Sequence, residues 1–263
     1  GFMKLAGVNH YFGMDEYDND EDFDGLWGIW DEPFLQFYAE RLNTFPQPFF
    51  SSFFSVSSHH PFKIPENYEG TFEGGPLPIH QCIEYTDHSL RRFFQTVSKM
   101  PWYDSTLFVI TADHTSSNIL YPEYRTGWGF YAVPLMFFKP DNSLAGMVHE
   151  IGQQTDIMPS VLGYLHYSRP YIAFGRDIFR ESTTPVAFNY KDNTYQLIEG
   201  EYLLVFDGRR VIALYNFFED NLMQVNLIDR HPEIVRDMEK RIKAVIQQYN
   251  NRMIEDRLTV EGK

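Results

Sequence analysis

The chain has 263 residues, 43% of them hydrophobic, which is enough to bury one large core or one core with a small appendage. Its formal net charge of −14 argues against nucleic acid as a partner, because a phosphate-binding surface needs a surplus of Lys and Arg. Cys82 is the single cysteine, so an internal disulfide and a CxxC metal knuckle are excluded.

The start of the chain does not look natural, because the first methionine is residue 3. We interpret Gly1 as a tag scar and the chain as a piece of a longer protein. No apolar run in this sequence approaches the ~18 residues of a membrane span, and we expect no signal peptide within it.

The first third opens with a dense acidic run over residues 15–22, which we predict to be a solvated loop. Calcium-binding EF-hand spacing fails there, since the glycine and glutamate of that motif are missing. Asp31-Glu32-Pro33 then predicts a helix start, with the proline in the first turn.

Two predicted core elements follow, a strand and a long helix. Residues 48–56 (PFFSSFFSV) predict a strand that ends on Ser57-Ser58-His59-His60. Residues 79–100 predict a helix with one apolar side, formed by Ile83, Leu90, Phe93, Phe94 and Val97. A helix of ~20 residues between two strands indicates a βαβ crossover, and hence parallel neighbours.

The stretch Ser105–Thr115 (STLFVITADHT) carries the strongest chemical signal. Its apolar run predicts a strand over 105–112 that is buried on both faces. Asp113 and His114 follow at the carboxyl end of this strand, where α/β sheets place their ligands. A carboxylate beside an imidazole is half of a mixed oxygen and nitrogen site for a divalent metal. The alternative is that Asp113 caps the next segment and His114 is an ordinary loop histidine.

The middle of the chain predicts a third strand over 131–138 and a helix over 151–165 that starts near Asp156. His149-Glu150 begins like a zinc-protease motif, but residue 153 is glutamine and the second histidine is absent. The last third predicts an antiparallel meander and then an amphipathic helix that opens at His231-Pro232-Glu233. The four predicted strands cover residues 185–189, 194–198, 202–206 and 211–215.

Four motifs in order resemble the carboxyl-terminal part of the sulfatase-like, alkaline-phosphatase-type family, and most closely its lipoteichoic acid synthase group of phosphoglycerol transferases. They are HHPF at 59–62, YTDHSLRRFF at 85–94, WYDSTLFVITADH at 102–114 and QTDIMPSVL at 154–162. Residues 214–227 (LYNFFEDNLMQVNL) also resemble the closing strand and loop of sulfatases.

The resemblance implies site roles for three residues. Asp113 and His114 match an Asp-His pair that supplies two ligands to a divalent metal, which could be Mn, Zn, Mg or Ca. His59 matches a histidine that contacts the substrate phosphate or the leaving group. We expect the three side chains to converge within roughly 10 Å, a spread that one metal and one phosphate can bridge.

The chain also departs from the family pattern. The family's threonine nucleophile, its early acidic metal ligand, and the tryptophan and arginine that hold the phosphate have no match here and are expected upstream. We assign no nucleophile to Thr115 or to any serine of residues 51–58. The fragment alone is therefore expected to be inactive, with weak or absent metal binding.

The resemblance further implies a membrane-anchored parent with this domain outside the cytoplasm, periplasmic or extracellular. The expected substrates are a phospholipid headgroup or a sulfated or phosphorylated glycan, with no nucleic acid partner. The membrane would be reached only through upstream segments, and the fragment itself should be soluble. Two alternatives stay open: a glycan sulfatase, and a non-catalytic binding module that kept the fold.

The predicted fold class is α/β, with a mainly parallel sheet between helices and a small carboxyl-terminal antiparallel sheet with its helix. Strands 48–56, 105–112 and 131–138 should be parallel or mixed members of one sheet. We expect residues 1–180 to be part of the catalytic domain and residues 181–263 to be an antiparallel subdomain.

Overall fold

The computed structural model describes residues 2–180 and 184–260. The chain divides into two compact units, each described by itself. Unit 1 comprises Gly1–Leu107 with Lys139–Ser143, and unit 2 comprises Phe108–Phe138 with Leu144–Lys263. Gly1 lies outside the described residues, so its interpretation as a tag scar stays a prediction. The domain boundary predicted at 180/181 lies next to residues outside the described ranges and also stays a prediction.

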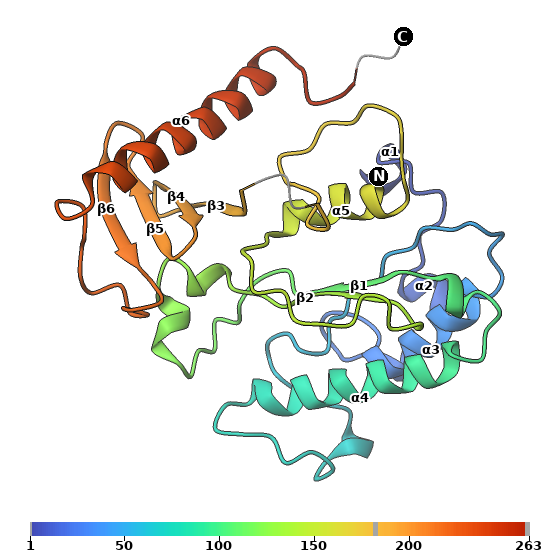
Figure 1. Cartoon of the computed structure of the whole chain (residues 1–263). Coiled ribbons are helices and arrows are strands. Elements are labelled where there is room, and N and C mark those ends of the chain that lie inside the picture. Colours follow the sequence, from blue (N-terminus) through green and yellow to red (C-terminus); the bar gives the residue numbers. More distant parts are fainter. Residues whose placement is uncertain (1, 181–183, 261–263) are drawn as a thin grey trace. The chain divides into compact units, whose positions relative to one another are not determined.

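Unit 1 is built on two α-helices that pack together, α3 (Asp31–Leu42) and α4 (Ile79–Val97) (Figure 1). Leu35, Ala39 and Leu42 are the buried apolar residues of α3, at the spacing of one helix face. The buried apolar residues of α4 are Ile79, Cys82, Tyr85, Phe93 and Val97. Ile83 is 52% exposed, so the predicted apolar side of this helix is wrong at that position. The core face runs through Cys82 and Tyr85 instead.

The remaining helical segments of unit 1 are short. Most of the acidic run is exposed as predicted, yet two short helical segments cover much of it where we expected a loop. They are α2 (Met14–Tyr17) and the 3-10 turn η1 (Asp20–Asp22). The other short segments are α1 (Phe2–Leu5), η2 (Glu66–Tyr68) and η3 (Tyr103–Ser105).

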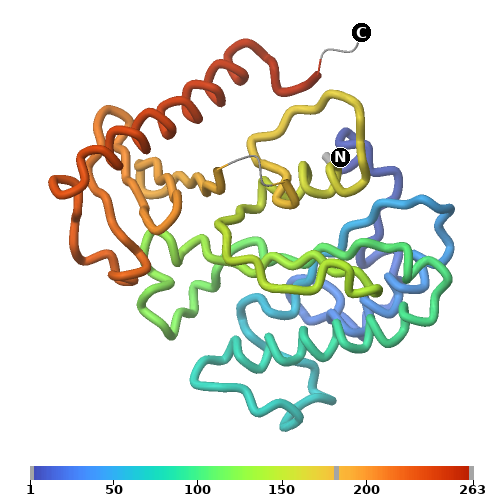
Figure 2. The backbone as a smooth tube through the Cα atoms, viewed as in Figure 1, coloured from blue at the N-terminus to red at the C-terminus, as the bar shows by residue number. Residues whose placement is uncertain are grey.

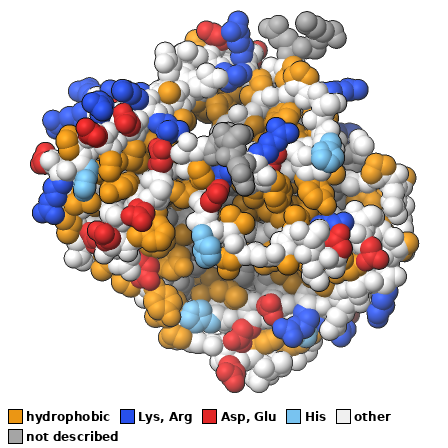
Figure 3. All heavy atoms as spheres, in the orientation of Figure 1, with side chains coloured by type: hydrophobic (Ala, Val, Ile, Leu, Met, Phe, Trp, Pro, Cys, Tyr) orange, Lys and Arg blue, Asp and Glu red, His pale blue; other side chains and the backbone are white. Residues whose placement is uncertain are grey.

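Residues 48–56 do not form the predicted strand. Phe49 and Phe53 do pack inward, against Trp102 and Tyr38. Phe50 and Phe54 are 87% and 69% exposed. Figure 3 shows in orange the apolar side chains on one face of the surface. A strand needs a second strand to hydrogen-bond with, and an apolar sequence alone does not supply one. No described segment pairs with residues 48–56, so the predicted βαβ crossover lacks its first strand.

Unit 2 contains β1 (Phe108–Thr111) and β2 (Leu135–Phe138), which pair antiparallel from Phe108–Phe138 to Thr111–Leu135. Figure 2 shows the two segments side by side. This two-stranded antiparallel pair is not the parallel or mixed three-stranded arrangement predicted for residues 48–56, 105–112 and 131–138, and both strands are shorter than predicted. β1 is half-buried, so the expectation of burial on both faces is wrong.

The second sheet of unit 2 is the predicted antiparallel meander, in the order β3-β4-β5-β6. Its strands are β3 (Val186–Lys191), β4 (Thr194–Glu199), β5 (Tyr202–Phe206) and β6 (Val211–Asn216). Helix α6 (Pro232–Ile254) lies along this sheet (Figure 1). Met238 and Ile242 of α6 share a buried cluster with the strands, whose other members are Leu197, Leu204, Phe206, Val211 and Leu214.

The predicted helix over 151–165 is shorter in the structure and is preceded by a 3-10 turn. It consists of η6 (Gln154–Asp156) and α5 (Ile157–Tyr164). Two further turns, η4 (Pro122–Arg125) and η5 (Gly129–Tyr131), lie between β1 and β2. Among the described helices, none combines the length and the apolar character that crossing a membrane requires.

Candidate functional site

Asp113 and His114 lie two and three residues beyond the end of β1 in unit 2. The Asp113 Oδ1 atom accepts a hydrogen bond from the His114 backbone N–H at 2.8 Å. The other carboxylate oxygen, Oδ2, lies 3.5 Å from the His114 Nε2 atom. Both side chains are more than half exposed, at 58% and 65%. An oxygen and a nitrogen therefore face one another in a place that a ligand can reach.

The separation of these two atoms fits a shared metal ion. Two ligand atoms at about 2.0–2.1 Å from a tetrahedral ion lie about 3.3 Å apart, close to the observed 3.5 Å. The His114 Nδ1 atom lies 2.9 Å from the Thr115 carbonyl oxygen, which can only accept, so Nδ1 carries a proton. In the neutral ring this leaves the lone pair on Nε2, the nitrogen that faces Asp113.

The pair supplies only two ligands, whereas zinc sites use three or four protein ligands. Among the residues that the structure describes, no group of three or more His, Cys, Asp or Glu side chains could hold a metal ion. The ligand roles of Asp113 and His114 therefore stay predictions. The separation of their side-chain atoms is compatible with these roles.

Sequence reasoning missed Gln154, which contacts the same loop. Its Nε2 atom donates to the carbonyl oxygens of Ala112 and Asp113, at 2.8 and 2.9 Å. In the sequence it stands out only as the first residue of the QTDIMPSVL motif. A glutamine before a helix carries no pattern that points to a loop more than 40 residues earlier, so no local signal could have identified it.

Thr115 stands beside the pair, and its hydroxyl donates to the Phe130 carbonyl oxygen. The Thr115 hydroxyl is thus engaged with the backbone, and we assign it no catalytic role.

His59 lies in unit 1, in a turn that follows residues 48–56. Its imidazole ring packs against the indole ring of Trp27, with ring centroids 3.9 Å apart. The Trp27 Nε1 atom donates to the His60 carbonyl oxygen at 2.6 Å, which holds the indole against this turn. His59 is exposed, so it is accessible to a substrate.

The backbone before His59 is held by a second residue that sequence reasoning missed as a site residue, Asp31. This carboxylate is 1% exposed and lies at the start of α3. Its Oδ1 atom accepts from the backbone N–H groups of Val56 and Ser57, at 2.9 and 3.3 Å. Its Oδ2 atom accepts from the Thr86 hydroxyl at 3.1 Å. Burial raises the pKa of Asp31, and these hydrogen bonds offset part of that rise.

His59 belongs to unit 1, whereas Asp113 and His114 belong to unit 2. The expected convergence of the three side chains therefore stays a prediction. What the structure describes is the local geometry of each loop and the side chain that holds it.

Unit 1 also has a pocket of about 270 Å³ that contains none of the three predicted site residues. It is lined by aromatic, acidic, amide and proline side chains, namely Asp22, Trp30, Glu32, Pro33, Gln36, Pro65, Asn67, Tyr68 and Tyr85. Within it the Tyr68 hydroxyl donates to Glu32. Burial, followed by this contact with the carboxylate, raises the pKa of Tyr68 to about 12.

The curated relatives of the chain include lipoteichoic acid synthases. Lipoteichoic acid synthase 1 of Bacillus subtilis is 28% identical over 209 residues, which cover 72% of this chain and 32% of the relative. Lipoteichoic acid synthase 2 of the same organism is 26% identical over 222 residues, covering 76% and 34%. The chain thus spans about a third of the length of these proteins.

Solved structures show the fold. The lipoteichoic acid synthase LtaP from Listeria monocytogenes matches with a TM-score of 0.77 at 22% identity, covering 99% of this chain and 67% of that one. A protein in the alkaline phosphatase superfamily from Vibrio parahaemolyticus also gives 0.77, at 21% identity, with 94% and 60% covered. These matches confirm the predicted α/β, alkaline-phosphatase-like fold class.

The family profile named Sulfatase matches residues 1–167, well over half of the chain. This match contains all four motifs on which the resemblance rests, and it includes the loops of His59 and of Asp113-His114. The chain belongs to the sulfatase family.

Proposed function

We propose that this chain supplies the late metal ligands and a substrate-contacting histidine of an enzyme that transfers or hydrolyses phosphate or sulfate esters. The observation that carries the proposal is the pairing of Asp113 Oδ2 with His114 Nε2, 3.5 Å apart and exposed beyond the end of β1. A glutamine that holds the backbone of this pair adds support, because such sites need ligands fixed in place.

The roles follow from the chemistry of each side chain. Asp113 and His114 would hold a divalent ion (Mn, Zn, Mg or Ca), which lowers the pKa of an attacking hydroxyl and neutralises charge on the transferred group. His59 would contact the substrate phosphate or the leaving group. Its packing against Trp27 limits the positions that the imidazole can take.

The threonine nucleophile and the first acidic ligand would come from residues that precede this segment in the full-length protein. The chain spans only about a third of its curated relatives, which leaves room for such residues elsewhere. We propose that the segment alone is inactive and binds the metal weakly or not at all, because two ligands do not complete a coordination shell.

The curated relatives favour phosphoglycerol transfer over glycan desulfation, since those named here are lipoteichoic acid synthases. We propose a phospholipid headgroup as the donor substrate and a position of this domain outside the cytoplasm. Membrane attachment would come from other parts of the full-length protein.

Turnover of nitrophenyl phosphate and nitrophenyl sulfate by a longer protein that includes the preceding segment tests the proposal. With added manganese, Asp113→Ala, His114→Ala and His59→Ala should each lower kcat/KM by at least about 100-fold, since each removes a group at the reacting centre. Asp229→Ala and His149→Ala, two exposed positions in unit 2, are the matched controls. Full activity of Asp113→Ala would refute the assignment.

A further inference from the structure

The loop that carries Asp113 begins where β1 stops pairing with β2. The ladder between β1 and β2 ends at the Thr111–Leu135 pair. Beyond it, the carbonyl oxygens of Ala112 and Asp113 both accept from the single amide nitrogen Nε2 of Gln154, at 2.8 and 2.9 Å. One side chain therefore holds two successive carbonyls at the residues that lead into the candidate ligand pair.

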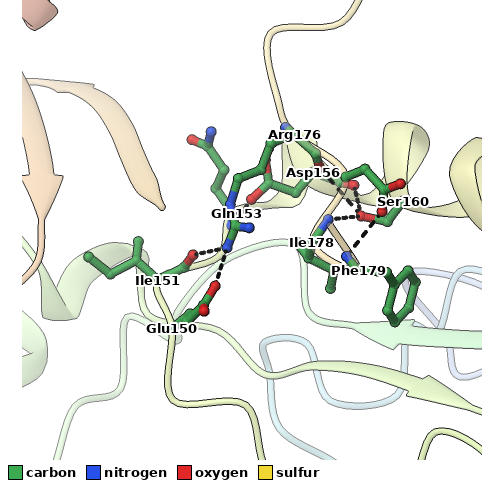
Figure 4. Close-up of polar contacts among 9 residues, drawn as sticks. Glu150, Ile151, Gln153, Asp156, Ser160, Arg176, Ile178 and Phe179 are labelled. Carbon is green, nitrogen blue, oxygen red and sulfur yellow. Dashed lines mark hydrogen bonds and ion pairs between the residues drawn. The ribbon is translucent and has the colours of Figure 1, made fainter. Parts of the chain in front are cut away.

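Gln154 is itself held by a buried polar network. It opens the turn η6, which ends at Asp156, a carboxylate with no exposed surface. Asp156 accepts from the Gln153 N–H at 3.1 Å and from the Arg176 N–H at 2.8 Å. The Ser160 hydroxyl donates to the Asp156 carbonyl oxygen at 2.6 Å (Figure 4). Both oxygens of a buried carboxylate thus fix the turn from which Gln154 extends.

The segment before η6 is held from two further directions. The Arg176 guanidinium donates to the Ile151 carbonyl oxygen at 3.2 Å and to Glu150 at 3.0 Å (Figure 4). The Gln153 side-chain oxygen accepts from the Phe188 N–H of β3 at 3.1 Å. A side chain mounted on a segment held in this way can restrain a loop, because its own backbone has little freedom.

We propose that Gln154 is the positioning residue of the Asp113–His114 pair, acting through the backbone carbonyls of Ala112 and Asp113. The proposal rests on the proposed function, in which that pair holds the metal ion. Gln154 would not touch the ion. It would fix the loop so that Asp113 Oδ2 and His114 Nε2 stay at a separation that one ion can bridge.

Hydrogen exchange of the metal-free chain tests the restraint without any metal. Gln154→Met keeps the length of the side chain and removes both donors. The amides of residues 113–115 should exchange at least about 10-fold faster in this variant. Gln247→Met, at an exposed position of α6, should leave the same amides unchanged. Unchanged exchange in Gln154→Met would overturn the proposal.

A second variant guards against a loss of folding. Gln154→Glu keeps the shape but replaces the donating amide with a carboxylate that can only accept when ionised, so it too should speed exchange. Faster exchange throughout unit 2 would indicate unfolding instead of a local release, and would count against a positioning role. Faster exchange confined to residues 113–115 supports it.

Manganese affinity of the longer protein then separates the two proposals. Loss of a residue that orients a ligand typically weakens binding 10–100-fold, so Gln154→Met should raise the Kd by about that factor. Gln247→Met should leave it unchanged. If Asp113→Ala does not weaken binding, the proposed function fails. If Asp113→Ala abolishes binding while Gln154→Met changes neither affinity nor exchange, only the positioning role fails.

Discussion

At the scale of single residues, both candidate loops are held by a polar side chain at or just before a helix start. Asp31 accepts hydrogen bonds from two successive N–H groups before His59. Gln154 donates to two successive carbonyls before His114. A carboxylate suits the first task and an amide the second, because one only accepts and the other can donate. Backbone N–H and C=O groups in loops are not paired within a sheet or helix, so side chains such as these supply their hydrogen-bond partners.

Asp31→Ala should destabilise the protein by about 2–5 kcal/mol. The substitution leaves the buried Ser57 N–H and the half-buried Val56 N–H without their acceptor, and a buried donor without a partner costs about 1–3 kcal/mol. Asp31→Asn is the matched control, since its side-chain oxygen can still accept from both. Urea unfolding measures the free energies, and equal stabilities of the two variants would contradict this role of Asp31.

The raised pKa of Asp31 predicts a pH dependence of stability. Because burial makes the folded protein hold this proton more tightly than the unfolded chain, protonation stabilises the fold. That contribution is fully present below the unfolded pKa of about 3.9 and is lost as pH rises through the folded value. Relative to Asp31→Asn, the wild type should therefore gain stability as pH falls from about 7 to about 4. Urea titrations of both proteins across this range measure the difference, and a constant or opposite trend would refute it.

At the scale of elements, the carboxyl-terminal sheet depends on α6 for one of its covered faces. Ile242 has no exposed surface and belongs to the same buried cluster as strands β4, β5 and β6. Ile242→Ala should cost about 2–5 kcal/mol, through lost burial and the cavity left behind. Ile254→Ala, at the 83% exposed end of the same helix, should change stability by less than about 0.5 kcal/mol. Thermal unfolding of both variants tests this, and similar losses would mean that α6 is not packed as described.

The close approach of residues 155 and 175 gives a second test at this scale. A Cβ atom on Gly175 would lie 2.1 Å from the Thr155 carbonyl oxygen and 2.6 Å from the Asp156 nitrogen, both backbone atoms. Gly175→Ala should therefore force the η6 turn to move and cost on the order of 1–3 kcal/mol.

Gly152→Ala is the matched control, because a Cβ atom there would meet nothing within 4 Å. Denaturant unfolding of both variants gives the comparison. Equal effects of the two substitutions would contradict the tight contact between residues 155 and 175.

At the scale of the whole molecule, the meander and the final helix could be predicted because strand alternation, turn residues and helical spacing all agree within each short stretch. The strand over 48–56 could not, because a strand also needs a neighbour that no local pattern supplies. The predicted apolar side of α4 is correct at Phe93 and Val97, which are buried, and wrong at Ile83. Side-chain bulk alone does not show which face packs, and Cys82 and Tyr85 are buried in place of Ile83.

The candidate site divides in the same way. Asp113, His114 and His59 could be named from residue chemistry and from motifs, since ligand types follow directly after apolar runs. Asp31 and Gln154 could not, because their partners are backbone groups 25 and 42 residues away, and they act through hydrogen bonds that leave no mark on composition.

The most direct test of the central claim is anomalous diffraction from manganese bound to crystals of the longer protein. We predict a manganese peak about 2.0–2.3 Å from an oxygen of Asp113 and from Nε2 of His114, the bond lengths of such ligands. His59 should face the same site from within reach of one phosphate group. A manganese ion held by other residues, with Asp113 and His114 both turned away from it, would contradict the claim.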